Sequence, residues 1–240
     1  MKYENPLLKA QFIRRYKRFF TEAKLEEKIV LAHTPNTGPM TSCLEKNGYV
    51  YLSQAPTHSA NGKKKPPRKL AYTLELTEVQ GQLIGVNTHK TNALVAEALE
   101  NKVITEFDNI ANLRREYPIG NSRFDFYYER KGKKGLIEVK NVTLKGPENM
   151  ALFPDTVSTR ALKHVQEMRH LTSQNFECTF LFVINRPDLN AFSPAFDIDP
   201  AYAQALKEAT SEGVQVLAYQ CIPTINEHAL TQKLPVKYIF

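Results

Sequence analysis

Residues 122–144 read SRFDFYYERKGKKGLIEVKNVTL, and this segment predicts two β-strands joined by a turn. Aromatic and β-branched residues, which favour strands, are concentrated in Arg123–Glu129 and Leu136–Val142. Between these runs lies Lys131-Gly132-Lys133-Lys134-Gly135, whose glycines and charges indicate a turn. The segment is therefore expected to form a β-hairpin.

The segments on either side of this hairpin alternate between helical and strand patterns. Gly120-Asn121 indicates a further turn, which follows a strand at Arg115–Ile119. Helices are predicted at Thr88–Asn101, at Ser158–Leu171 and between Asp199-Pro200 and Gly213, and further strands at Cys178–Ile184 and Val214–Tyr219. Because a strand, a helix and a strand in succession form a βαβ unit, residues 88–240 are expected to be an α/β domain with a partly parallel sheet.

The first third of the chain has the pattern of a small all-β domain. Short β-branched and aromatic runs predict strands at Glu27–His33, Gly48–Gln54, Ala71–Glu78 and Gln82–Asn87. Ala55–Lys69 contains prolines and mutually repelling lysines, so it is expected to be an exposed loop. Several strands at near-regular spacing favour a small barrel or sandwich over residues 1–87.

The net charge of +7 is carried entirely by this part of the chain. Residues 1–88 contain 14 Lys and Arg against 7 Asp and Glu, whereas residues 89–240 contain 18 of each kind. Such an asymmetry is typical of a protein that binds a polyanion such as nucleic acid. The alternative is that the surface lysines serve only solubility.

Length and composition exclude several classes of protein. The 240 residues are 42% hydrophobic and 24% charged, which excludes disordered, collagen-like and disulfide-scaffold proteins. No apolar run approaches the ~20 residues that span a bilayer, and residues 1–10 lack the pattern of a signal peptide. Three cysteines without close pairing suit a reducing compartment, so a cytoplasmic protein without a membrane partner is expected.

Three charged residues of the hairpin are candidates for a catalytic site. Alternation along the second strand places Glu138 and Lys140 on one face and their neighbours Ile137 and Val139 on the other. Asp125 lies on the preceding strand of the same hairpin. Two carboxylates and an ammonium are therefore expected to meet at one end of a sheet.

Two carboxylates in contact require a proton, a cation or a metal ion. At about 4 Å they repel each other by about 4 kcal/mol at an effective dielectric of about 20. Oxygen ligands favour Mg²⁺ or Mn²⁺, which can acidify water and stabilise charge at phosphorus. Asp125 and Glu138 are thus candidate metal ligands, and with Lys140 they are candidate catalytic residues for phosphodiester hydrolysis. The alternative is a same-face salt pair on an exposed strand.

Several short motifs together identify a protein family far more specifically than any one of them does alone. They are His33–Met40 (HTPNTGPM), Val86-Asn87-Thr88, Ser122–Phe126 (SRFDF), Ile137–Leu144 (IEVKNVTL), and Phe153-Pro154-Asp155 with Arg160 and His164. On these segments the chain resembles the SfsA (sugar fermentation stimulation protein A) family over nearly its full length. The resemblance implies an N-terminal OB-like β-barrel at residues 1–87 and a C-terminal α/β domain, similar to PD-(D/E)XK nucleases, at residues 88–240. It also implies non-specific DNA binding and a regulatory role in sugar metabolism.

Gln11–Glu22 is interpreted in two ways. Its apolar residues recur at helical spacing, which predicts an amphipathic helix. The resemblance instead makes the segment the first strand of the barrel, and basic and aromatic side chains would then interleave as in a groove for single-stranded nucleic acid. In that case Arg14, Tyr16 and Arg18 share one face, and Arg15, Lys17 and Phe19 share the other. The alternative is that the aromatic rings fill the core and the arginines are merely solvated.

Further residues are candidates for nucleic-acid contact. Asn36 lies in a turn of Pro, Asn and Gly, although a purely structural Asx turn is slightly favoured there. Arg160 and His164 share one face of a predicted helix, with Lys163 in the same turn, and together they could bind a phosphate beside Lys140. The alternative is an exposed polar helix face. Arg123, in the family-like SRFDF segment, is a further candidate.

A third carboxylate for the metal could come from either of two elements. Glu97 lies on the predicted helix Thr88–Asn101, and first-helix Glu residues take this role in related nucleases. Glu116 lies on the strand that adjoins Asp125. Either could equally be a surface residue.

Two functions from different classes remain open. The first is a Mg²⁺- or Mn²⁺-dependent nuclease whose barrel recruits nucleic acid, most naturally DNA. The second is a non-catalytic, non-specific DNA-binding regulator of sugar (maltose-type) metabolism. A sugar-processing enzyme is suggested only by the family's name, because no carboxylate pair suited to glycoside chemistry stands out. A homodimer is left open, since many nucleases of this shape pair to cut both strands.

Overall fold

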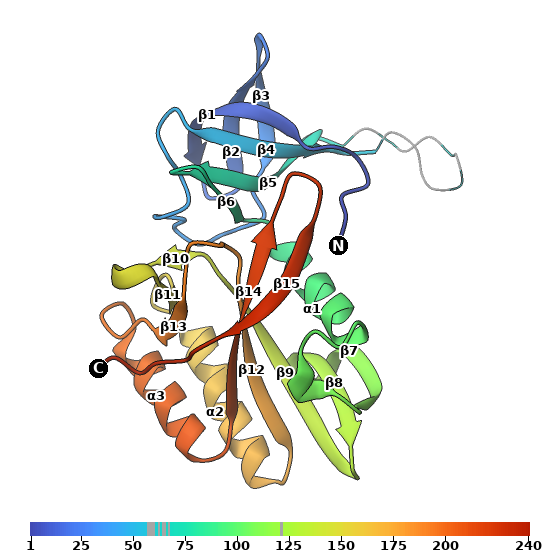
Figure 1. Ribbon diagram of the computed structural model, residues 1–240, viewed down its shortest axis with the longest axis vertical. Helices are drawn as coiled ribbons and strands as arrows, with labels where there is room; N and C mark the ends of the chain where they lie inside the picture. Colours follow the sequence, from blue (N-terminus) through green and yellow to red (C-terminus); the bar gives the residue numbers. More distant parts are fainter. Residues whose placement is uncertain (57–60, 62, 64–65, 67, 121) are drawn as a thin grey trace.

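The computed structural model covers residues 1–240 and describes all of them except 57–60, 62, 64–65, 67 and 121. The chain forms a β-barrel and an α/β domain, which lie one above the other along the long axis of the molecule (Figure 1). In the described part of the chain, no helix is long and apolar enough to cross a membrane.

The barrel is formed by strands from the first third of the chain. They are β1 (Leu8–Tyr16), β2 (Phe20–Leu25), β3 (Lys28–His33), β4 (Tyr49–Gln54), β5 (Tyr72–Val79) and β6 (Gln82–Gly85). The order is β3-β2-β1-β4-β5-β6, and a parallel pairing of β3 with β5 closes β1 to β5 into a barrel. Small and aliphatic side chains such as Ala10, Ala23, Leu52 and Leu74 fill the interior. The predicted small barrel is confirmed.

Both interpretations of Gln11–Glu22 need correction. The segment is not a helix, because it contains the end of β1, a turn at residues 17–19 and the start of β2. Strand alternation also stops at Tyr16, since Lys17 and Arg18 take left-handed backbone conformations with φ of 48° and 61°. The apparent helical spacing arises because Tyr16 and Phe20 pair across the turn, with ring centroids 5.4 Å apart. A tight hairpin therefore produced the spacing that predicted a helix.

Two predicted loops fall partly outside the described residues. In Ala55–Lys69, residues 57–60, 62, 64–65 and 67 lie outside them, and the other positions belong to neither a helix nor a strand. In the predicted turn Gly120-Asn121, Asn121 lies outside them, whereas Gly120 has φ of 56°, a conformation that favours glycine.

The second domain is built on a mixed sheet in the order β15-β14-β12-β9-β8-β7. Strands β9, β12 and β14 run parallel, and β8, β7 and β15 are antiparallel to their neighbours. The bounds are β7 (Ala111–Ile119), β8 (Ser122–Arg130), β9 (Lys133–Val142), β12 (Glu177–Ile184), β14 (Gln215–Pro223) and β15 (His228–Leu234). The predicted hairpin is β8–β9, with a shorter turn than expected because β9 already begins at Lys133. The predicted partly parallel sheet is confirmed.

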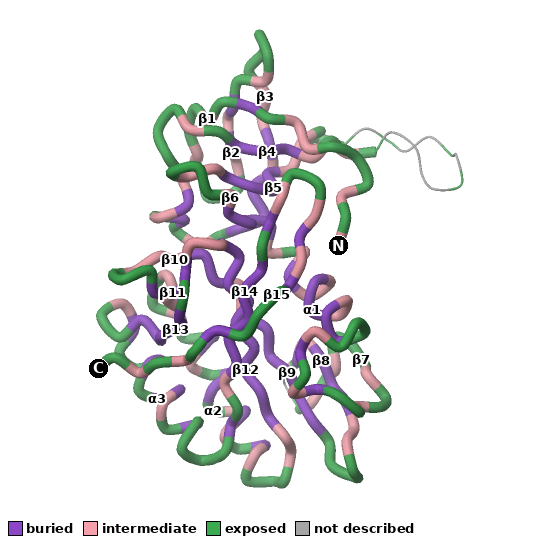
Figure 2. The backbone as a smooth tube through the Cα atoms, viewed as in Figure 1, coloured by how far each residue is buried: buried purple, intermediate pink, exposed green. Residues whose placement is uncertain are grey.

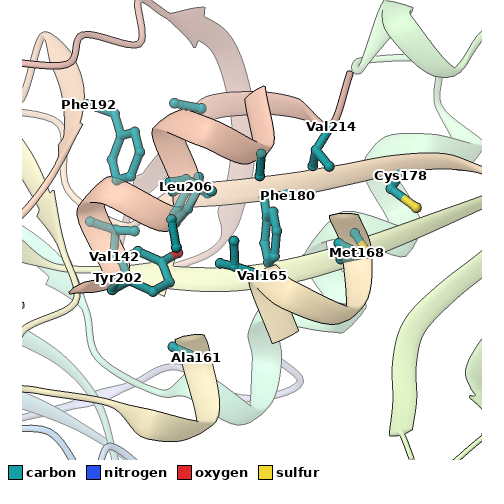
Figure 3. Packing of buried hydrophobic residues seen from close by; sticks show 14 of the residues in the cluster. Val142, Ala161, Val165, Met168, Cys178, Phe180, Phe192, Tyr202, Leu206 and Val214 are labelled. Atoms are coloured by element: carbon teal, nitrogen blue, oxygen red, sulfur yellow. The ribbon is translucent and has the colours of Figure 1, made fainter. Parts of the chain in front are cut away.

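Helices cover both faces of this sheet, whose central strands are largely buried (Figure 2). On one face, α2 (Thr159–Ser173) and α3 (Pro200–Ser211) pack through Val165, Met168 and Leu206 against Phe180 and Val142 (Figure 3). On the opposite face lies α1 (Thr91–Glu100). Short elements flank the sheet: β10 (Leu144–Lys145), β11 (Met150–Phe153), β13 (Ala191–Pro194), and the 3-10 helices η1 (Thr88–Lys90), η2 (Thr105–Phe107) and η3 (Pro147–Asn149).

Buried polar contacts join the two domains. Arg186, only 2% exposed, donates from Nη1 to the carbonyl oxygen of Ser42 in the barrel domain at 3.1 Å and to that of Thr143 at 3.0 Å. Asp188 accepts two further hydrogen bonds from the same guanidinium, at 2.7 and 2.9 Å. Because its charge is paired and its donors are used, this arginine can stay buried between the domains.

Candidate active site

Strands β8 and β9 separate at the predicted site, and Asp125 bridges the gap. The regular pairing of the two strands reaches only Phe126 and Ile137. Beyond that pair, Oδ2 of Asp125 accepts the backbone N–H of Val139 at 2.7 Å. Its Oδ1 accepts a hydrogen bond from the side-chain amide of Asn92, in α1, at 2.6 Å. Asp125 is therefore held by donors from a strand and from a helix.

Glu138 is buried, and one of its carboxylate oxygens has no hydrogen-bond partner among the described residues. The residue is 4% exposed. Its Oε1 accepts a hydrogen bond from Nζ of Lys140 and contacts Nδ1 of His164, in α2, both at 2.6 Å. Its Oε2 is buried and, in the described part of the chain, has no hydrogen-bond partner. An unpartnered buried carboxylate oxygen is costly, and a bound cation would offset that cost.

The predicted alternation along β9 is confirmed. Ile137 and Val139 lie in the core beneath α1, whereas Glu138 contacts His164 of α2 together with Lys140. The side chain of Asp125 accepts the N–H of Val139, the residue between Glu138 and Lys140 in β9, so the three charged residues meet at the point where β8 and β9 separate.

The two carboxylates differ in their electrostatics. Burial, together with the charge of Glu138, raises the pKa of Asp125 to about 6, although the N–H of Val139, Asn92 and Lys140 act against this rise. Burial also acts to raise the pKa of Glu138, but the hydrogen bond from His164 and the charge of Lys140 outweigh it and lower this pKa. A divalent cation would allow both carboxylates to be ionised together, so the donor set of oxygen atoms fits a hard cation.

Neither candidate for a third carboxylate reaches this site. The carboxylate of Glu97 accepts a hydrogen bond from the amino group of Met1. Glu116 forms an exposed ion pair with Arg123 at 2.9 Å. Over the residues that the structure describes, no three His, Cys, Asp or Glu side chains form a group that could hold a metal ion. The site thus offers two carboxylates, which is the number that Mg²⁺ often uses beside water and substrate oxygens.

The three residues of α2 that were predicted to contact nucleic acid lie in different surroundings. His164 is buried against Glu138, so it orients that carboxylate and does not face a phosphate on the surface. Lys163 is exposed, and its Nζ lies 3.5 Å from Oε1 of Glu167 on the next turn of the helix. Arg160 is exposed at the start of the helix, and no ion pair to it is found within the described residues.

The candidates on the barrel separate in the same way. Arg14 is paired with Glu22, through Nε and Oε2 at 2.7 Å. Arg15 donates to the carbonyl oxygens of Asn36 at 2.8 Å, Gly38 at 2.9 Å, Pro39 at 3.2 Å and Arg18 at 2.9 Å, so it holds a loop in place. These two guanidinium groups are therefore already used within the barrel.

The rest of the barrel candidates lie at the surface or in that loop. Tyr16 stacks on Phe20, and Lys17 and Arg18 are exposed in the turn between β1 and β2. The side-chain oxygen of Asn36 accepts the N–H of Gly38 at 2.9 Å, which is the structural Asx turn that the sequence slightly favoured.

Asn92 is the site residue that the sequence did not indicate. It donates to Asp125 from 33 residues away. Asparagine at the start of a helix has many ordinary roles, so only the packing of α1 on the sheet reveals this contact.

Comparisons with known proteins agree with this architecture. The family model described as SfsA N-terminal OB domain matches residues 13–86, and the model described as Sugar fermentation stimulation protein RE domain matches residues 89–227. Sugar fermentation stimulation protein homologs from Alteromonas mediterranea and Pseudomonas fluorescens are 41% and 40% identical to the chain, and each alignment covers 98% of the chain and 99% of the relative.

A solved structure of SfsA from Pyrococcus furiosus, in complex with Ca²⁺, is similar over 99% of this chain and 98% of that chain, with 25% identity and a TM-score of 0.86. The predicted architecture, an OB-like barrel followed by an α/β domain, is thereby confirmed. The chain belongs to the SfsA, or sugar fermentation stimulation protein, family.

Proposed function

We propose that this protein is a divalent-metal-dependent nuclease, with DNA as the substrate that we favour. The observation that carries the proposal is the convergence of Asp125, Glu138 and Lys140 where β8 and β9 separate. The unpartnered oxygen of Glu138 supports it further, because such an oxygen is suited to bind a cation.

The residues of the site have distinct roles in this proposal. Asp125 and Glu138 would hold the cation, which when bound supplies positive charge at the attacked phosphate and acidifies water. Lys140, whose Nζ lies 2.6 Å from Glu138, would donate to an oxygen of the phosphate as negative charge develops there. Asn92 and His164 would act as positioning residues, because each fixes one of the two carboxylates before the substrate binds.

Mg²⁺ and Mn²⁺ are the proposed cations. The relative from Pyrococcus furiosus was solved with Ca²⁺, which also prefers oxygen ligands. This supports a hard divalent cation, and the choice of Mg²⁺ or Mn²⁺ rests on their usual role beside phosphate groups.

The barrel would recruit the nucleic acid. OB barrels commonly bind oligonucleotides, and residues 1–88 carry the whole excess of positive charge. Lys17 and Arg18 in the turn after β1, and Arg160 at the start of α2, are exposed cations suited to contact phosphates.

Cleavage by purified protein tests the proposal. With Mn²⁺ or Mg²⁺, wild type should cut at least one of single-stranded, duplex and branched DNA. Asp125→Asn and Lys140→Ala should abolish cutting while DNA binding persists, and Asp108→Asn, an exposed carboxylate in the turn before β7, is the matched control. If wild type leaves all of these substrates intact with both ions, the nuclease proposal is wrong.

A second candidate function is a non-catalytic, DNA-binding regulator of sugar metabolism. One observation favours it: the exposed cations Lys17, Arg18 and Arg160 would serve DNA binding whether or not the two carboxylates hold a metal ion. Both candidates require DNA binding, so the cleavage assay separates them.

Two other expectations remain proposals. The cytoplasmic location is supported by Cys43, Cys178 and Cys221, which are all free thiols. A homodimer would let two sites cut opposite strands, and the mass of the protein in solution, alone and with duplex DNA, would test it.

A further inference from the structure

A cavity of about 300 Å³ lies between the barrel and the α/β domain. The barrel contributes its turn at residues 36–38. The α/β domain contributes residues 141–144, at and just after the end of β9, and residues 152–156, which are the end of β11 and the segment after it. These wall segments overlap three of the motifs that the sequence analysis singled out. The nuclease mechanism uses Glu138 and Lys140 of one motif, but it uses no residue of the wall segments themselves.

The cavity adjoins the candidate active site. Strand β9 carries Glu138 and Lys140 and then continues into the cavity wall at Asn141. At about 3.3 Å per residue, Thr143 lies roughly 10 Å along the chain direction from Lys140. A nucleotide attached to a phosphate at the active site could therefore place its base in this cavity.

The walls have the chemistry that a nucleobase needs. Leu144, Leu152 and Phe153 offer apolar surface for the flat faces of a base, whereas Thr37 and Asp155 offer polar groups for its edge. An unpaired base is generally recognised in this way, by apolar or aromatic contact on its faces and hydrogen bonds on its edge. The volume is sufficient for one base and part of its sugar.

The carboxylate of Asp155 is a hydrogen-bond acceptor at this cavity. In the described part of the chain, the hydrogen bond found to its carboxylate comes from its own backbone N–H, and burial raises its pKa. Its Oδ2 lies close to Gly38: a Cβ atom at that position would be only 2.1 Å from this oxygen. The backbone of the barrel turn therefore approaches the carboxylate of Asp155 directly, with no side chain between the two. The hydrogen bonds that Arg15 donates to Asn36 and Gly38 hold the barrel loop in this position.

We propose that this cavity binds an unpaired nucleobase next to the scissile phosphate, with the carboxylate of Asp155 accepting an amino N–H from the edge of the base. The inference rests on the proposed function in nucleic-acid cleavage. Cytosine presents an amino group, whereas thymine places acceptor oxygens on both sides of its single N–H, so the site discriminates in favour of cytosine.

Binding of labelled single-stranded 12-mers tests this inference without any cleavage. Fluorescence anisotropy in EDTA compares oligo-dC, oligo-dT and an oligo-dC with abasic sites. Wild type should bind oligo-dC roughly tenfold more tightly than either of the other two. Asp155→Asn should reduce the preference for oligo-dC over oligo-dT to about one, because an amide can pair with either base. It should leave most of the preference over the abasic oligonucleotide, because the apolar walls still contact the base.

Two further variants guard against indirect effects. Thr37→Trp adds bulk from an exposed position at the cavity, and it should likewise remove the preference for oligo-dC. Asp108→Asn removes the same charge from the turn before β7, which does not line the cavity, and it should keep the wild-type ratios. Loss of a negative charge alone would tighten binding of all three oligonucleotides equally, which distinguishes electrostatics from base recognition.

The outcomes separate this inference from the nuclease proposal. Equal affinities of wild type for the three oligonucleotides, an unchanged preference for oligo-dC over oligo-dT in Asp155→Asn, or no binding at all would overturn base recognition, even if the protein cuts DNA. Discrimination by wild type that Asp155→Asn removes would support it, even if no cleavage is found with any metal.

Discussion

Asp125 and Glu138 share one site, but their pKa values move in opposite directions. Asp125 receives hydrogen bonds from neutral N–H groups, and burial raises its pKa to about 6. Glu138 is also buried, but it faces the ammonium of Lys140 and the imidazole of His164, and its pKa is lowered. One carboxylate is therefore ionised at neutral pH, and the other titrates close to it unless a cation is present.

Asp125→Asn should change how stability depends on pH. The pKa of Asp125 rises from 3.8 to about 6 on folding, so its ionisation destabilises the folded state, and this loss develops as the pH rises from about 4 to about 6. The shift corresponds to at most about 3 kcal/mol. Without metal, the variant should therefore gain melting temperature relative to wild type as the pH rises. The difference in melting temperature, variant minus wild type, should be several degrees greater at pH 7 than at pH 4.

The metal dependence of the same variant provides the control. Saturating Mn²⁺ should raise the melting temperature of wild type and leave that of Asp125→Asn nearly unchanged, because only wild type keeps both carboxylates. If, without metal, the melting temperatures of the two proteins differ by the same amount at pH 4 and at pH 7, the raised pKa of Asp125 is contradicted.

His164 provides a second prediction at the scale of single residues. Its ring contacts Oε1 of Glu138, so His164→Ala should lower kcat of DNA cleavage by about 10- to 100-fold, as expected when a residue that orients a metal ligand is lost, with little change in KM. His164→Gln, which keeps a hydrogen-bonding group, should recover part of the activity. A rise in KM at constant kcat would instead indicate that His164 binds phosphate, as the sequence alone suggested.

At the scale of elements, the sequence predicted the hairpin β8–β9 and the faces of its side chains, because alternation is a local property of a strand. It did not predict that the two strands separate beside Asp125. That separation depends on a side-chain acceptor replacing a strand carbonyl, and on Asn92, which belongs to a distant helix. Contacts between elements that are far apart in sequence leave no periodic signal.

Gln11–Glu22 illustrates the opposite error. Its spacing of apolar residues predicted a helix, although the aromatic rings of Tyr16 and Phe20 pair across a hairpin turn. The resemblance to a known family corrected the type of element but not its end, because it could not show that Lys17 and Arg18 form a left-handed turn.

Gly135 tests the packing within the hairpin. The sequence placed it in a turn, but it lies in β9 opposite Tyr128, and a Cβ there would be 2.0 Å from the tyrosine ring. Gly135→Ala should therefore destabilise the protein by about 1–3 kcal/mol, through displacement of a buried ring. Chemical denaturation should show this loss, whereas the exposed neighbour Lys134→Ala should have little effect. Equal stability of the two variants would mean that the ring moves freely.

At the scale of the whole molecule, the sequence showed where the excess positive charge lies, but not which of these cations are free to contact a phosphate. Arg14 and Arg15 contribute to the +7, yet both guanidinium groups are held by acceptors within the barrel domain. Lys17, Arg18 and Arg160 remain exposed. A charge count cannot separate these cases, because pairing depends on the folded arrangement of acceptors.

The salt dependence of binding to duplex DNA tests this division. Arg160→Ala should reduce the slope of log affinity against log salt by about 0.9, the value for one lost phosphate contact. Arg169→Ala is the matched control on the same helix, because Arg169 is paired with Glu208 and Glu212. If the two variants change the slope equally, net charge alone determines binding and α2 makes no specific phosphate contact.

The buried arginine between the domains has a consequence for the products of the proposed nuclease. Arg186 is bonded at once to Ser42 in the barrel domain, to Thr143 beside the sheet and to Asp188, so the barrel cannot swing freely on the α/β domain. A nucleic-acid strand bound by the barrel would then reach the carboxylates of Asp125 and Glu138 at a constant distance from its binding site on the barrel. Digestion of an end-labelled oligonucleotide should accordingly give a narrow set of fragment lengths, measured from the bound end, instead of a continuous ladder.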